Sequence, residues 1–162
     1  MASEDSTPST HVIGVISDTH GLVRPSALDA LRGVDLILHA GDIGSKDVVL
    51  ALEELAPVRL VRGNTDLEDW SRTLPETDVV EVGRHWVYML HDLAALPLDP
   101  AAGGFSVVIS GHSHKPRQAW QRGVLYFNPG SAGPRRFHLP ISVGRLLIRD
   151  DQVEGELIRL DE

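Results

Sequence analysis

Uninterrupted apolar runs alternate with amphipathic stretches in the first part of the chain. The runs predict buried β-strands at 12–17, 35–40 and 58–63. Helices are predicted between them at 25–31, with Pro25 at the first position and Gly33 beyond the end, and at 45–55, with Ser45 as N-cap. This order of elements predicts parallel strands joined by helical crossovers.

After Pro75 the pattern changes to short apolar runs separated by turns. We expect strands at 79–82, 86–90, 106–110, 118–121, 124–127, 141–148 and 153–160. About ten strands with two or three helices are too many for one narrow sheet. The predicted fold class is therefore α/β, with two packed β-sheets flanked by helices.

Composition narrows the class of protein. The chain has 162 residues, of which 42% are hydrophobic and 23% charged, and this composition is typical of one globular domain. We expect the domain at 11–162, after a polar, acidic tail at 1–10 that we expect to be disordered. The absence of cysteine excludes thiolate metal sites and favours a cytoplasmic protein. We expect neither a signal peptide nor a membrane span. The net charge of -8 argues against a general nucleic-acid-binding surface.

The predicted strands end in similar loops, in which metal-binding residue types follow the apolar run. Seven side chains follow five strands in this way: Asp18, His20, Asp42, Asn64, His91, His112 and His114. Because sites in parallel sheets form beyond the carboxyl ends of the strands, we expect these loops to meet in space. Gly41, Gly63 and Gly111 directly precede candidate ligands, as expected where the backbone turns tightly against an ion.

The kinds of donor indicate the kind of site. Two Asp, one Asn and four His supply seven donors, more than one tetrahedral zinc site with an open position uses. They suit a binuclear site, in which one carboxylate bridges two ions ~3.5–4 Å apart. The Asp-x-His and His-x-His spacings place the paired side chains on one face of an extended segment.

The segments GVISDTHG, HAGDIG, VRGNTD, the isolated His91, GHSHKPR and FNPGSAGPRR resemble the calcineurin-like metallophosphoesterase superfamily over residues 12–149. The short length and the NPGS segment are most similar to its small prokaryotic phosphodiesterase branch. The resemblance implies a sandwich of two mixed sheets with helices outside. It also implies one ion held by Asp18, His20 and His114, another held by Asn64, His91 and His112, and Asp42 as the bridge. Direct catalytic roles are expected for Asp18, Asp42, Asn64 and His112.

Other polar residues in the same segments receive structural interpretations. We expect a hydrogen-bonded structural role for His39, and we expect Asp66 to orient the loop that carries Asn64. Arg135 and Arg136 could bind a substrate phosphate or be a solvated pair. Loop-shaping roles are expected for Asn128, Gly130 and Ser131, and surface positions for His11, His85 and His138.

The resulting functional hypothesis is hydrolysis of a small phosphodiester by a hydroxide that bridges the two ions. Mn²⁺ is the first choice for the ions, with Fe, Zn or Ni as alternatives, because mixed His and carboxylate ligation does not separate them. Two other functions stay open: a phosphomonoesterase or protein phosphatase, and a protein-binding scaffold like a eukaryotic retromer subunit of this fold. A homodimer is compatible with so small an enzyme.

Two departures from the superfamily pattern bear on the chemistry. Where many members have a His after the Gly-Asn pair, this chain has Thr65. In those members the His is positioned to protonate the leaving group or to stabilise the phosphoryl oxygens, so Thr65 predicts a preference for diesters with acidic leaving groups. After His91 this chain has Asp92-Leu93 in place of a further Gly and His, which changes that loop.

Overall fold

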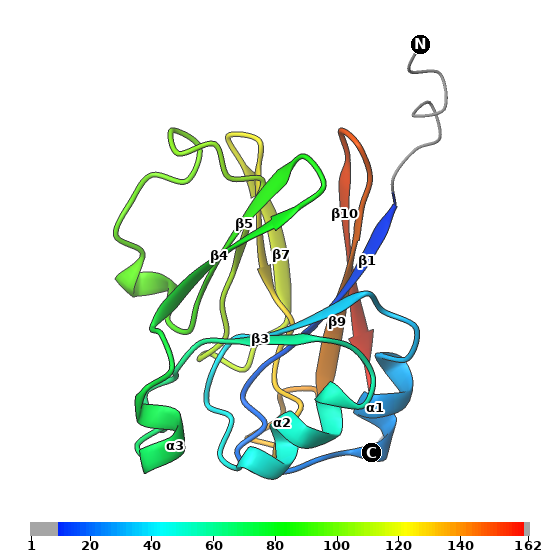
Figure 1. Ribbon diagram of the computed structural model, residues 1–162, viewed down its shortest axis with the longest axis vertical. Coiled ribbons are helices and arrows are strands. Elements are labelled where there is room, and N and C mark those ends of the chain that lie inside the picture. The colour runs from blue at the N-terminus through cyan, green and yellow to red at the C-terminus, as the bar shows by residue number, and fades with distance from the viewer. Residues whose placement is uncertain (1–9, 161–162) are drawn as a thin grey trace.

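The computed structural model describes residues 10–160 of the chain (Figure 1), and within this part ten strands form two five-stranded sheets. The first sheet has the order β10-β9-β1-β2-β3, with β1 (His11–Ile16), β2 (Leu36–His39), β3 (Val58–Leu60), β9 (Ser142–Ile148) and β10 (Val153–Arg159). The second has the order β4-β5-β6-β8-β7, with β4 (Thr77–Val82), β5 (His85–Leu90), β6 (Val107–Ile109), β7 (Arg117–Gln121) and β8 (Val124–Asn128).

Both sheets are mixed, as the resemblance implies. β1 pairs in parallel with β2 and β2 with β3, whereas β9 runs antiparallel to both β1 and β10. In the second sheet β5, β6 and β8 are parallel, and β4 and β7 are antiparallel strands at the two edges. The parallel strands of the first sheet are joined through the predicted helices α1 (Pro25–Ala30) and α2 (Lys46–Glu53), and Ser45 Oγ caps α2 by accepting a hydrogen bond from Asp47 N at 3.1 Å.

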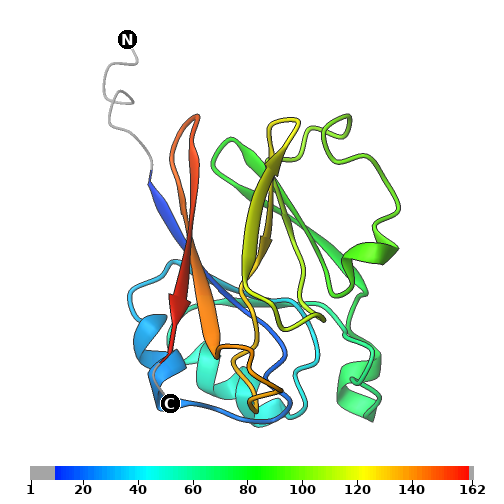
Figure 2. The ribbon, with the colours of Figure 1, turned by 180° about the vertical axis from the view of Figure 1, so that it is seen from behind.

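The molecule has layers because alternate residues along β1 face opposite sides of the first sheet. Ile13 and Val15 of β1 pack in the core between the two sheets, whereas Ile16 packs against the helices. Helices α1 and α2 cover only the outer face of the first sheet (Figures 1 and 2). The outer face of the second sheet packs instead against the segment after β5, which contributes Leu96, Ala101 and Phe105.

The predicted sandwich is confirmed, and the differences are local. The strand expected at 58–63 ends at Leu60, because Arg62 N turns away to donate to Pro75 O at 2.7 Å. Two single-turn helices were not predicted: α3 (Asp69–Arg72) and the 3-10 helix η2 (Leu93–Ala95). No helix in residues 10–160 is long and apolar enough to cross a membrane. The expected tail at 1–10 lies outside the described residues except for Thr10, and the domain boundary stays a prediction.

His85 is not the surface residue that the sequence predicts. Its Nδ1 lies 2.7 Å from Ser106 Oγ, and its Nε2 lies 3.0 Å from the carbonyl oxygen of Arg149. The half-buried ring therefore connects β5 to the β9–β10 hairpin, across the two sheets. His11 is also half-buried, whereas His138 is exposed as expected.

Candidate metal centre

The loops that carry the seven candidate ligands lie at the carboxyl ends of β1, β2, β3, β5 and β6, as the strand pattern predicts. Main-chain hydrogen bonds join neighbouring loops directly. Asp18 N donates to Gly41 O at 3.0 Å, and His20 N donates to Asp42 O at the same distance. Between the strands of the second sheet, Gly111 N donates to His91 O at 2.9 Å. The loops therefore form one connected surface that spans both sheets.

Five of the seven candidate ligands have a left-handed backbone conformation, which side chains other than glycine rarely adopt. Their φ angles are 57° at Asp18, 47° at His20, 56° at Asp42, 70° at His112 and 64° at His114. Only two other non-glycine residues in the described part of the chain have a positive φ. Such strain occurs mainly where the surrounding structure fixes a functional side chain. The fold holds these residues in unfavourable conformations, which aim their side chains into one space.

The three glycines that precede candidate ligands are required by close approach. A Cβ on Gly63 would lie 2.1 Å from Asp42 Oδ1, and one on Gly111 would lie 2.0 Å from Ser17 Oγ. A Cβ on Gly41 would lie 2.8 Å from His91 Nδ1. The expectation that backbone passes tightly around the site is confirmed at all three positions.

The first group of candidate ligands consists of Asp18, His20 and His114. Asp18 is fully buried at the end of β1, and its Oδ1 lies 3.4 Å from His114 Nε2 and 3.9 Å from His20 Nε2. Its other carboxylate oxygen accepts hydrogen bonds from Ser17 Oγ at 2.7 Å and from His112 N at 3.0 Å. One oxygen of Asp18 is thus fixed by protein donors, whereas the other faces the two imidazoles.

The second group contains Asp42, His91 and again Asp18. His91 Nε2 lies 3.3 Å from Asp42 Oδ2 and 3.8 Å from Asp18 Oδ1, and the opposite ring nitrogen lies 2.8 Å from Ala40 O. Because a carbonyl oxygen can only accept, Nδ1 carries the proton of that hydrogen bond. His20 Nε2 also lies 3.8 Å from Asp42 Oδ2, so Asp42 faces both groups.

Asn64 and His112 lie at the exposed rim of the site. His112 Nδ1 lies 3.2 Å from Asn64 Oδ1, and its ring packs edge-on to His91 with the ring centroids 5.2 Å apart. His112 Nε2 is also 4.0 Å from the carboxylate of Asp92. The structure therefore brings all seven predicted residues together, four buried, one half-buried and two at the rim.

The pKa shifts follow from this crowding. Burial alone would raise the pKa of Asp18, but His114, Ser17 and the charge of His91 outweigh burial and lower it. Burial would also raise the pKa of Asp42, but contact with His91 and a hydrogen bond from the Thr65 N–H lower it well below its ordinary range. The Thr65 N–H donates to Asp42 Oδ1 at 2.9 Å. Burial would lower the pKa of His91, but Asp42 and Asp18 raise it. Both carboxylates are therefore ionised at neutral pH.

Several buried polar atoms at the centre fit divalent ions. Asp18 Oδ1, His20 Nε2 and His91 Nε2 are buried and have no hydrogen-bond partner among residues 10–160. Two ligands about 2.0–2.2 Å from one ion lie roughly 3–3.5 Å apart, close to the separations found here. Asp18, His20 and His114 could hold one ion, as could Asp18, Asp42 and His91. Buried groups without partners are costly, and a bound cation would satisfy them.

Asp66 and His39 hold the ligand loops in place through hydrogen bonds to their backbone, as the sequence predicts. The carboxylate of Asp66 accepts main-chain hydrogen bonds at 2.8–3.3 Å from Asp42, Ile43, Gly44 and Gly63, which ties two ligand loops together. Gly41 N donates to His39 Nδ1 at 3.1 Å. Thr19 Oγ1 donates to Ile43 O, so it accepts from His39 Nε2 at 2.9 Å. His39 is therefore neutral, and burial lowers its pKa to about 4.

The segment between β8 and β9 passes along the same end of the molecule (orange in Figure 2). Asn128 Nδ2 donates to Gly111 O at 3.0 Å, and its Oδ1 accepts from Gly130 N at 2.9 Å. Ser131 Oγ donates to Asp18 O at 3.0 Å. The expected loop-shaping roles are thereby confirmed. Arg135 and Arg136 are exposed farther along, and neither interpretation of that pair is decided by these contacts.

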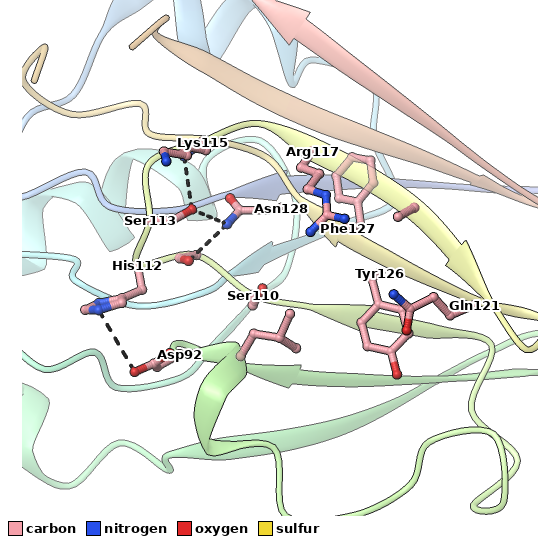
Figure 3. Close-up of a pocket in the computed structure, with 13 residues that line it drawn as sticks. Asp92, Ser110, His112, Ser113, Lys115, Arg117, Gln121, Tyr126, Phe127 and Asn128 are labelled. Carbon is pink, nitrogen blue, oxygen red and sulfur yellow. Dashed lines mark hydrogen bonds and ion pairs between the residues drawn. The ribbon is translucent and has the colours of Figure 1, made fainter. Parts of the chain in front are cut away.

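Two cavities lie beside the rim, and the sequence pattern predicts neither of them. One, of about 380 Å³, is lined by His112 and by the outer faces of β7 and β8 (Figure 3). The other, of about 450 Å³, is lined by Asn64 and His91. Asp92 lines both, so the cavities meet at the rim. They depend on how β7, β8 and η2 pack together, and no sequence motif marks them.

Two mixed sheets whose strand ends gather buried carboxylates and imidazoles define a metallophosphoesterase sandwich. The chain belongs to the calcineurin-like phosphoesterase superfamily, whose domain model matches residues 12–151. It is 38% identical to a probable metallophosphoesterase of Methanothermobacter thermautotrophicus, over 91% of this chain and 92% of that protein.

Solved structures of low sequence identity share the fold. An archaeal phosphodiesterase is similar with a TM-score of 0.74 and 24% identity, over 91% of this chain and 99% of that one. Vacuolar protein sorting 29 of Cryptosporidium parvum is similar with a TM-score of 0.73 and 19% identity, over 94% and 99% of the two chains. The fold is therefore shared by a phosphodiesterase and a vacuolar protein sorting protein, so the fold alone does not identify the function, which has to be argued from the site.

Proposed function

We propose that this metallophosphoesterase is a binuclear, metal-dependent phosphodiesterase. The observation that carries the proposal is a set of buried ligand atoms, Asp18 Oδ1, His20 Nε2 and His91 Nε2, that have no hydrogen-bond partner within residues 10–160. Both imidazole nitrogens lie within 4 Å of Asp18 Oδ1 and of Asp42 Oδ2. In this proposal Asp42 would bridge two ions. One ion would be held by Asp18, His20 and His114, and the other by Asn64, His91 and His112.

The ions, Mn²⁺ as first choice with Fe, Zn or Ni as alternatives, would activate a water and neutralise charge on the phosphoryl oxygens. The protein holds the ligands in place for this chemistry. Ser17 Oγ and His112 N fix one oxygen of Asp18, and the N–H of Thr65 fixes one oxygen of Asp42. The hydrogen bond from His91 Nδ1 to Ala40 O leaves Nε2 free to bind an ion.

Charge and shape favour a phosphodiester as substrate. Two divalent ions contribute about +4 against the carboxylates of Asp18 and Asp42, so the centre attracts an anion although the chain carries a net charge of -8. Asn64 and His112 are the exposed ligands, so the phosphoester approaches at the rim. A diester has two organic groups, and one cavity lies on each side of the rim. A monoester would fill only one of them.

The two alternatives make different demands on the site. A phosphomonoesterase needs donors for a second negative phosphoryl oxygen, and no lysine or arginine side chain among the described residues is hydrogen-bonded to Asn64 or His112. A protein-binding scaffold tolerates the loss of ligands, whereas all seven candidates are present in this sequence and five of them lie in the two groups around Asp18 and Asp42. Both features favour the phosphodiesterase.

A substrate screen of metal-reconstituted protein tests the proposal. Bis-p-nitrophenyl phosphate should be hydrolysed faster than p-nitrophenyl phosphate, and Asp42→Ala should lower the rate by more than about 10²-fold. The matched control is Asp69→Ala, because Asp69 is fully exposed on α3. Faster turnover of the monoester would favour the phosphomonoesterase, and no turnover of either ester with Mn, Fe, Zn or Ni would favour the scaffold.

A further inference from the structure

The cavity beside His112 has a composition of its own. It lies on the outer face of the second sheet, between β7, β8 and η2 (Figure 3), and holds about 380 Å³, within the range of small-molecule sites. His112, a candidate metal ligand, forms one wall. A group bound in this cavity would therefore lie next to a phosphoester held at the metal centre.

Strand alternation gives this cavity a basic end and an apolar wall. Arg117 and Ala119 project from the same face of β7, because alternate residues of a strand share a face. The strand register pairs them with Asn128 and Tyr126 of β8. In Figure 3 the guanidinium of Arg117 extends toward the interior of the cavity, and the ring of Tyr126 lies across from it. Leu93 of η2 adds a second apolar surface.

Arg117 carries a charge that nothing in the described part of the chain compensates. Neither its guanidinium nor the Lys115 ammonium, which also lines the cavity, has a hydrogen-bond or ion-pair partner within residues 10–160. The cavity on the other side of the rim differs, because its Arg62 is paired with Glu76 and with Arg72 O. Of the two cavities at the rim, the one beside His112 is therefore the one whose cationic side chains have no partner within residues 10–160, in a protein with a net charge of -8.

A partnerless guanidinium opposite an aromatic ring binds a particular kind of group. Tyr126 and Leu93 provide apolar area for a planar ring, and Arg117 can form a bidentate pair with a carboxylate or phosphate on that ring. Asp92, at the mouth beside His112, is 48% exposed and would repel an anion placed there. The anion therefore belongs at the Arg117 end, away from the phosphoester.

We propose that this cavity is a substrate subsite for an aromatic alcohol that carries a second negative charge, so that the substrate is an anionic aryl or heterocyclic phosphodiester. The proposal rests on the proposed phosphodiesterase function. The ring packs on Tyr126, the distal anion pairs with Arg117, and the phosphodiester lies at the rim formed by His112 and Asn64.

Binding of phosphonates, which contain a stable carbon–phosphorus bond, tests the subsite without turnover. Calorimetry should show that 4-carboxybenzylphosphonate binds about tenfold more tightly than benzylphosphonate, because it adds a charge-assisted pair. Benzylphosphonate should bind about threefold to tenfold more tightly than methylphosphonate, because of the ring. Arg117→Gln should remove the carboxylate preference, and Tyr126→Ala should reduce the ring preference. Arg84→Gln, an exposed arginine in the β4–β5 turn that does not line the cavity, is the matched control and should keep both.

Kinetics with three diesters of one leaving group complete the test. p-Nitrophenyl esters of methyl, phenyl and 4-carboxyphenyl phosphate should show kcat/KM rising in that order, with the last step lost in Arg117→Gln. Equal affinities for benzylphosphonate and its carboxylated form in the wild type, or a preference that survives Arg117→Gln, would overturn the subsite. If all three esters are cleaved at equal rates, the subsite fails while the phosphodiesterase stands. If the phosphonates bind as expected but no ester is cleaved, the subsite stands and the proposed activity fails.

Discussion

The carboxylate of Asp66 accepts a hydrogen bond from the main-chain N–H of Asp42 at 2.9 Å. The same carboxylate accepts from Gly63 N at 2.8 Å, so one buried side chain sets the distance between two ligand loops. The proposed bridge between the ions is therefore positioned by a residue that touches neither ion. Such supporting residues commonly change metal affinity by about 10–100-fold.

The first prediction concerns Asp66. Asp66→Asn places an amide NH₂ against main-chain N–H donors, so it should destabilise the fold by about 2–4 kcal/mol and weaken metal binding by about 10–100-fold. Denaturant unfolding and metal titration measure the two effects. The control is Asp69→Asn, an exposed Asp-to-Asn change on α3, which should alter neither. Unchanged metal affinity in Asp66→Asn would show that the loops do not depend on this carboxylate.

The second prediction separates steric crowding from backbone strain. A Cβ on Gly63 would lie 2.1 Å from Asp42 Oδ1 and 2.3 Å from Asp42 N, so Gly63→Ala should displace Asp42 and abolish metal binding. Gly123, in the β7–β8 turn, has a positive φ of 79° but nothing within 4 Å of an added Cβ. Gly123→Ala should therefore cost only about 1–2 kcal/mol of stability and leave metal binding intact. Metal titration of both variants tests whether close contact with Asp42 or a positive φ determines the effect. Full metal binding by Gly63→Ala would contradict the site geometry.

The third prediction concerns pH. The pKa of His39 is lowered to about 4 in the folded protein, so below its ordinary value near 6.5 the unfolded chain binds a proton that the folded chain does not. This neutral imidazole therefore makes the metal-free protein lose about 2 kcal/mol of stability between pH 7 and pH 5. His39→Gln keeps a donor toward Thr19 and does not titrate, so its stability should fall less over this range by about that amount. Equal pH dependence of the two proteins, measured by denaturant unfolding, would contradict the assignment.

The fourth prediction concerns the proton of the leaving group. Thr65 has no titratable proton, and both oxygens of buried Asp66 accept main-chain hydrogen bonds, so neither residue can act as general acid. A missing general acid costs about 10²–10⁴-fold for alkyl leaving groups and little for p-nitrophenolate. We therefore expect log kcat/KM to fall steeply as the leaving-group pKa rises. A flat plot that becomes steep in Asp92→Asn would instead identify Asp92, at the rim, as the acid.

Local patterns predicted most of the fold. Uninterrupted apolar runs located the strands, and Ser45 marked the start of α2, where its side chain does cap the helix. The helix α3 was missed because Asp69–Arg72 is a single turn that buries only Ser71, which leaves no hydrophobic period to detect. His85 was misplaced because its partners, Ser106 and Arg149, come from segments distant in sequence.

The candidate site was predictable for a different reason. Each candidate ligand lies within five residues of the end of its strand. Asp18 and Asp42 follow neighbouring parallel strands of the first sheet, so sheet geometry brings them together, and His114 reaches them from the end of β6 in the second sheet. The proposed subsite was not predictable, because the register of β7 and β8, which places Arg117 and Tyr126 on the same face of the sheet, cannot be derived from the sequence pattern. Which residues bind ions, the identity of those ions and a homodimer stay predictions.

The metal content of reconstituted protein tests the central claim most directly. Protein loaded with Mn²⁺ and freed of excess ions should contain two ions per chain by elemental analysis, because two groups of candidate ligands, Asp18 with His20 and His114 and Asp18 with Asp42 and His91, lie side by side. Asp42→Ala should weaken both sites together, whereas His114→Ala should weaken mainly the site that it shares with Asp18. One ion or fewer per chain, with phosphodiesterase activity intact, would contradict the binuclear centre.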